Sequence, residues 1–180
     1  MELLSGNIMK KWLGFIAAVF FLSVISARAA TIEGTLGNTG DGEMTYRLGA
    51  GFPWERSWLD SDAGRLTGYW DAGYTFWEGG SEGGDRHLLS FSPVLVYEFD
   101  TDWFATPFVE AGIGAGVFSG SRVGDRQLGS LFQFENRIGF GLRFRNNHKA
   151  GFRAIHYSNA GIQDPNSGIG SYSLFYSFGF

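Results

Sequence analysis

A histidine and a serine two positions apart, His156 and Ser158, are the side chains in this sequence best placed to do chemistry together. Alternate residues of a β-strand point to the same side, so the pair shares a face if this segment is extended. A hydroxyl beside an imidazole is the arrangement that activates a serine nucleophile. The motif is short, and an interfacial histidine near a strand-end serine also fits it. Whether the motif indicates catalysis therefore depends on the secondary-structure elements that contain it.

The rest of the chain alternates between apolar and polar residues, which is the period of a β-strand. The clearest case is the C-terminal stripe of Tyr172, Leu174, Tyr176, Phe178 and Phe180. Seven further strands are expected within 32–38, 44–52, 66–76, 89–99, 109–117, 134–144 and 150–158, with turn-rich segments between them, including 53–64 and 120–129. An even number of strands of about ten residues is typical of a small outer-membrane barrel. The predicted fold is all-β, an eight-stranded antiparallel up-and-down transmembrane β-barrel.

The first 29 residues have the features of an export signal. Lys10 and Lys11 precede an apolar run from Trp12 to Ile25, and Ala27 and Ala29 form a small-x-small cleavage site. The run is shorter than the roughly 20 residues of a transmembrane helix. We expect residues 1–29 to be a signal peptide and 30–180 to be one β-barrel domain.

The composition excludes several classes of function. The chain of 180 residues has no cysteine, which rules out disulfides, thiolate zinc sites and cysteine nucleophiles. A net charge of −4 is a poor match for nucleic acid. The three histidines are scattered along the chain, with His87 and His148 expected in turns and His156 at a strand end. No metal and no other cofactor is therefore predicted.

Alternation alone leaves open which face points inward. A soluble ligand-binding barrel would place the apolar stripes inside and should fractionate with the periplasm. The export signal and the terminal aromatic stripe favour the membrane barrel. In that barrel His156 and Ser158 share the lipid-facing side with Phe152, while Arg153 points inward. Charged pairs such as Glu135 with Arg137 or Arg143 fill the interior.

Extended motifs around the pair identify a family. The run from Arg153 to Gly161, followed by Pro165-Asn166-x-Gly168-Ile169 and 171–176, closely resembles the PagL family of outer-membrane lipid A 3-O-deacylases. Residues 44–49, 64–74, 108–114 and 118–125 are also similar to that family, so the resemblance covers essentially the whole mature chain.

The resemblance implies a serine esterase that removes the 3-O-linked acyl chain of lipid A in lipopolysaccharide at the external leaflet of the bacterial outer membrane. Ser158 would be the nucleophile and His156 its base. The family's oxyanion donors map to the Gly161 N–H and the Asn166 side chain, and Asn159 and Phe134 map near the site. The assembly state stays open between a monomer and a homodimer.

One family position does not match. A glutamate that orients the imidazole is expected fourteen residues after the histidine, and Gly170 occupies that position. Pairing of the last two strands as a hairpin would place residues 156 and 170 side by side. Asp164 in the adjoining loop is one substitute acid. A slow Ser-His dyad and an inactive or non-catalytic small barrel are the alternatives.

Overall fold

The computed structural model describes residues 30–81 and 83–180, and the predicted signal peptide lies outside the described residues. No helix long and apolar enough to cross a membrane occurs among them. The described residues form 11 strands: β1 (Thr31–Thr39), β2 (Met44–Pro53), β3 (Trp58–Ser61), β4 (Gly64–Trp77), β5 (Arg86–Phe99), β6 (Ala105–Phe118), β7 (Arg122–Val123), β8 (Arg126–Gln127), β9 (Phe132–Phe144), β10 (His148–Ser158) and β11 (Ile169–Gly179).

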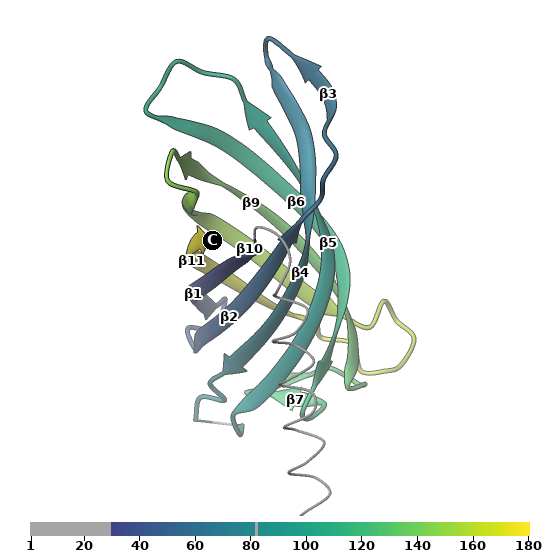
Figure 1. The fold of residues 1–180 in the computed structure, drawn as a ribbon. Helices are drawn as coiled ribbons and strands as arrows, with labels where there is room; N and C mark the ends of the chain where they lie inside the picture. The colour runs from purple at the N-terminus through teal and green to yellow at the C-terminus, as the bar shows by residue number, and fades with distance from the viewer. Residues whose placement is uncertain (1–29, 82) are drawn as a thin grey trace, which may run out of the picture.

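Eight long strands close into an antiparallel barrel in the order β2-β1-β11-β10-β9-β6-β5-β4, with β4 pairing back onto β2 (Figure 1). The predicted barrel is confirmed. Two predicted turn segments contain short hairpin strands that alternation did not reveal. The first, β3, pairs with β4, and β7 pairs with β8. These strands have only four and two residues, too few for a period to be read.

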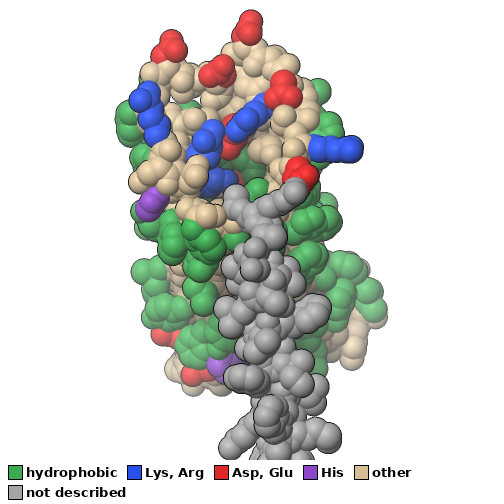
Figure 2. Space-filling view, viewed as in Figure 1, with side chains coloured by type: hydrophobic (Ala, Val, Ile, Leu, Met, Phe, Trp, Pro, Cys, Tyr) green, Lys and Arg blue, Asp and Glu red, His purple; other side chains and the backbone are tan. Residues whose placement is uncertain are grey.

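The apolar stripes lie on the outside of the barrel, as the membrane reading predicted. Ile113, Ile138 and Leu174 are all more than half exposed, and they belong to three different strands. Figure 2 shows green apolar side chains around the middle of the molecule, with charged side chains gathered at the end that carries β3. Such an apolar belt between polar ends matches the hydrocarbon layer of a bilayer.

Charged side chains fill the interior and neutralise one another. Arg137 donates from Nε to Glu135 at 2.7 Å and from Nη2 to Asp71 at 2.7 Å. Arg153 donates from Nε to Glu110 at 2.6 Å and also contacts Glu33. Burying an unpaired charge is costly, so these pairs make the polar lumen stable and confirm the predicted contact between Glu135 and Arg137. A polar lumen excludes the soluble-barrel arrangement with an apolar interior.

Two histidines lie elsewhere than predicted. His87 and His148 were expected in turns, but both sit on the exposed faces of strands β5 and β10. The Nδ1 atom of His87 is 2.6 Å from the hydroxyl of Tyr74, and His148 contacts Tyr176 in the same way. The strands extend further into the turn-like sequence than alternation indicated, because cross-strand aromatic partners hold these histidines in the sheet.

Candidate active site

The two catalytic candidates lie together on the outer face of β10, at the end of the barrel that carries β7 (Figure 1). His156 is exposed and Ser158 is half-buried, while Arg153 points into the lumen, as predicted. His156 pairs with Gly170 on β11, so the predicted hairpin register is correct. Its partner on the other side, on β9, is Asn136, a polar residue that sequence reasoning did not single out.

Two glycines of the following segment border the imidazole. A Cβ at Gly168 would lie 2.8 Å from Cε1 and 3.1 Å from Nε2 of His156, and Gly168 has a φ of +61°. Both the close approach and the left-handed backbone therefore require glycine at this position. A Cβ at Gly170 would lie 3.9 Å from Nδ1 of His156. The Nδ1 edge of the ring thus faces the position where the family's glutamate was expected.

The space beside the ring is a cleft of about 170 Å³ between β11 and the β1–β2 turn. We call it the histidine cleft. Two charged residues that sequence reasoning missed line it, Asp41 from the β1–β2 turn and Arg126 from β8. No local motif could have revealed them, because only barrel closure brings this turn next to β11. The remaining lining residues are Thr39, Gly40, His156, Ser167, Gly168, Ile169, Gly170 and Tyr172.

Asp41 and Arg126 form a bidentate ion pair. Nε and Nη2 of Arg126 each donate to a separate carboxylate oxygen of Asp41, both at 2.9 Å. Asp125 lies beside the same guanidinium, at 3.6 Å. Hydrogen bonding to Asp41 raises the pKa of Arg126, so this guanidinium stays charged at every physiological pH. The pair joins the β1–β2 turn to the β7–β8 hairpin over the histidine cleft.

The loop after β10 is held by Asn159, whose side chain is buried. Its Nδ2 donates to the carbonyl oxygens of Leu128 at 2.9 Å and Gln163 at 2.6 Å. Its Oδ1 accepts from the Gly161 N–H at 2.9 Å, and its own backbone N–H donates to Oδ1 of Asn166 at 3.1 Å. The amide nitrogen of Asn166 therefore remains available as a donor. The Gly161 N–H, in contrast, is already used within the loop.

The other predicted residues lie around this loop. Phe134 is half-buried opposite Ser158 and packs edge-on against Phe132, with ring centroids 5.3 Å apart. Asp164 is exposed in the loop, and within residues 30–81 and 83–180 no hydrogen bond or ion pair joins it to His156. The described residues also contain no group of three or more His, Asp or Glu side chains arranged to hold a metal ion.

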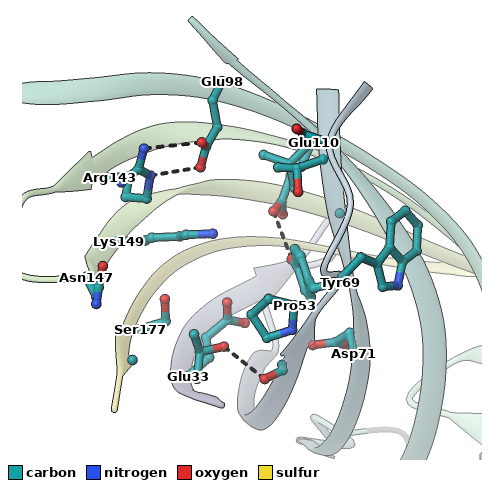
Figure 3. Close-up of a pocket in the computed structure, with 18 of the residues that line it drawn as sticks. Glu33, Pro53, Tyr69, Asp71, Glu98, Glu110, Arg143, Asn147, Lys149 and Ser177 are labelled. Atoms are coloured by element: carbon teal, nitrogen blue, oxygen red, sulfur yellow. Dashed lines mark hydrogen bonds and ion pairs between the residues drawn. The ribbon is translucent and has the colours of Figure 1, made fainter. Parts of the chain in front are cut away.

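A larger cavity of about 350 Å³ opens at the opposite end of the barrel. Figure 3 shows Lys149 pointing into it, with Arg143 paired to Glu98 and Tyr69 paired to Glu110. Most of its charged groups are strand residues of the lumen, and Glu55 and Arg56 come from the connection between β2 and β3. No histidine is among the residues that line this cavity.

Comparisons with known proteins identify the family of this chain. The family model described as lipid A 3-O-deacylase (PagL) matches residues 42–179. The chain belongs to the PagL family. It is 58% identical over 164 residues to the lipid A deacylase PagL of Pseudomonas aeruginosa, covering 91% of this chain and 94% of the relative. The PagL of Bordetella bronchiseptica is 35% identical over 118 residues, 65% of each chain.

A solved structure of PagL has the same fold. The crystal structure described as that of the outer membrane enzyme PagL is 59% identical to this chain, with a TM-score of 0.80. The match covers 82% of this chain and 98% of the crystallised one. The family predicted from the motifs around Ser158 is therefore confirmed.

Proposed function

We propose that this protein is an outer-membrane esterase that hydrolyses the 3-O-linked acyl chain of lipid A, with Ser158 as nucleophile and His156 as general base. The single observation that carries the proposal is the placement of a PagL-type His-x-Ser pair on the lipid-facing wall, at the end of the barrel. A pair on that wall meets its substrate within the membrane, so neither the acyl chain nor the sugar must enter the lumen.

The proposed reaction follows the logic of serine esterases. Nε2 of His156 takes the hydroxyl proton while Oγ of Ser158 attacks the ester carbonyl. The imidazolium then donates the proton to the departing 3-hydroxyl of the sugar, leaving an acyl-serine. A water molecule, deprotonated by the same imidazole, attacks the acyl-serine. The imidazolium returns that proton to Oγ of Ser158 as the acyl–oxygen bond breaks, which releases the fatty acid and regenerates the pair. Phe134 lies opposite Ser158, and Ile138 and Tyr172 lie on either side of Ala154, two residues before His156 on the same strand face. These aromatic and aliphatic side chains on the outer wall suit an acyl chain.

The tetrahedral oxyanion needs preorganised donors. The amide nitrogen of Asn166 is one, because its oxygen is held by the Asn159 N–H. The Gly161 N–H is the second, and it becomes available only if its bond to Asn159 is exchanged for the oxyanion. A charged acceptor favours that exchange, since charge-assisted hydrogen bonds are about twice as strong as neutral ones.

We also propose that the site faces the external leaflet. The connections at its end, 40–43, 78–85, 119–131 and 159–168, are the ones that follow outward-running strands when both termini are periplasmic. This is the leaflet that contains lipopolysaccharide.

The experiment is lipid A mass spectrometry on membranes that express the protein. Wild type is expected to produce a loss of mass equal to one 3-hydroxyacyl chain, and Ser158→Ala and His156→Ala are expected to abolish it. His87→Ala is the matched control, because His87 is also an exposed outer-wall histidine but lies on β5. Wild-type membranes with unmodified lipid A, or an active Ser158→Ala protein, would show that the function is not this one.

A further inference from the structure

The imidazole of His156 needs a hydrogen-bond acceptor at Nδ1 if its Nε2 is to act as base. Such an acceptor fixes the tautomer and stabilises the imidazolium. Gly170, the residue beside Nδ1, has no side chain to provide one. The question, which rests on the proposed function, is which group of this chain takes that role.

Barrel closure places the β1–β2 turn directly across from this glycine. The β1–β11 register runs through Thr39 opposite Ser171. Extending it by one residue places Gly40 beside Gly170, and Gly170 is the partner of His156. Two adjacent glycines therefore separate the imidazole from Asp41. A Cβ at Gly40 would have no heavy atom within 4 Å, so the space beside Gly40 is open.

Asp41 and His156 line the same cleft, and standard spacings give the separation across it. Adjacent strands lie about 4.8 Å apart, so His156 and the β1–β2 turn are separated by roughly 10 Å of backbone. The side chains of aspartate and histidine each reach roughly 3 Å from the backbone, from standard bond lengths. The gap that remains, roughly 4 Å, exceeds a hydrogen bond of about 2.8 Å by roughly 1 Å. Within residues 30–81 and 83–180 no hydrogen bond or ion pair joins Asp41 to His156, and Asp41 is paired with Arg126. The β1–β2 turn must therefore move toward β11 by about this amount for the bond to form.

Asp41 is the one carboxylate among the described residues that line the histidine cleft. Arg126 holds it with one donor on each oxygen. An ionised carboxylate has about four lone-pair sites, so it accepts a further N–H without losing the guanidinium. Arg126 holds the carboxylate at the rim of the cleft.

We propose that Asp41 is the positioning residue of this active site. Its carboxylate accepts the Nδ1–H of His156 across Gly40 and Gly170, so that Nε2 faces Ser158 as the base. The acid comes from the β1–β2 turn, on the side of β11 that faces away from β10, instead of from β11 itself. Asp41 does not touch the substrate ester and acts only through the imidazole.

The test compares deacylation by purified, folded wild-type protein and a set of variants, with kcat and KM measured separately. Asp41→Asn should lower kcat at least tenfold and leave KM within about twofold, because the acid of a triad acts in the transition state. In a protease triad, loss of that acid lowers kcat by up to about 10⁴-fold. Asp125→Asn is the matched control, an identical change beside the same Arg126 but outside the cleft. Its activity should equal that of the wild type.

The decisive arm is the double variant Asp41→Asn with Gly170→Glu. A glutamate at 170 supplies a carboxylate next to Nδ1, so it should restore most of the kcat lost in Asp41→Asn. Arg126→Gln separates the positioning role from simple loop bridging. If the ion pair only holds the loops together, Arg126→Gln and Asp41→Asn will lose the same activity and Gly170→Glu will rescue neither.

Each outcome decides between the two proposals. Wild-type protein without deacylase activity removes the proposed function. If the wild type is active and Asp41→Asn is equally active, only the role of Asp41 is removed. The same holds if Asp41→Asn loses kcat and Gly170→Glu does not restore it. The same role is overturned if Asp164→Asn, and not Asp41→Asn, shows the loss of kcat that Gly170→Glu reverses.

Discussion

Replacing Gly170 with glutamate tests the geometry of the site most directly. Residue 170 pairs with His156, and a Cβ there would be 3.9 Å from Nδ1. The two further carbons of a glutamate bring its carboxylate within hydrogen-bonding distance. The new Cβ would meet the carbonyl oxygen of Ile155 at 3.3 Å, which requires the neighbour to yield by a few tenths of an ångström. We therefore expect Gly170→Glu to fold and to raise kcat.

The size of the gain follows from the bond that is formed. A hydrogen bond to a charged group contributes about 1.5–3 kcal/mol. At 1.36 kcal/mol for each factor of ten, this corresponds to roughly 10–150-fold in kcat if the bond forms fully in the transition state. If Asp41 fills the role in part, as proposed, the gain in wild type should lie near the lower end. Near the membrane interface a new carboxylate costs only about 0–1 kcal/mol.

The assay is steady-state release of 3-hydroxy fatty acid from purified lipid A, after folding is checked by the shifted gel mobility of the unheated barrel. Gly170→Gln is the control, because it is similar in size and can accept the same bond but lacks the charge that stabilises imidazolium. It should give a smaller gain than Gly170→Glu. A folded Gly170→Glu protein with wild-type or lower kcat would refute the assignment of residue 170 to the Nδ1 side of the ring.

Two further substitutions probe the frame around the pair. Gly168→Ala should lower kcat by at least tenfold, because Gly168 has a φ of +61° and a Cβ there would overlap the ring of His156. The same kinetic assay on folded protein measures this loss, and an unchanged kcat would show that the ring lies elsewhere. Asn159→Ala leaves the Leu128 and Gln163 carbonyls without their donor and should destabilise the loop by about 1–3 kcal/mol, seen as faster limited proteolysis between residues 159 and 168. Resistance equal to wild type would contradict that role.

Local patterns were enough to predict most of the barrel. The stripe from Tyr172 to Phe180 and its upstream counterparts predicted the long strands, and the parity of Arg153 against His156 predicted which face meets the lumen. Both predictions succeed because the side-chain period of a strand is a property of neighbouring residues. The hairpin register of His156 with Gly170 was also predictable, since a single connection joins their strands.

The same patterns failed where contacts depend on distant parts of the chain. His87 and His148 looked like turn residues, and only their aromatic partners across the sheet showed them to be strand residues. The short strands β3, β7 and β8 have too few residues to show a period. The commitment of the Gly161 N–H to Asn159 depends on how one loop folds back on itself.

The sequence by itself determined the fold class, the family, and the pairing of His156 with Ser158 on the lipid-facing side of one strand. The tertiary structure alone decided what surrounds the imidazole. Barrel closure joins the first strand to the last, so the β1–β2 turn with Asp41 lies across from Gly170. Strand period is encoded by adjacent residues, whereas this juxtaposition arises from pairing between opposite ends of the chain, which no local spacing records.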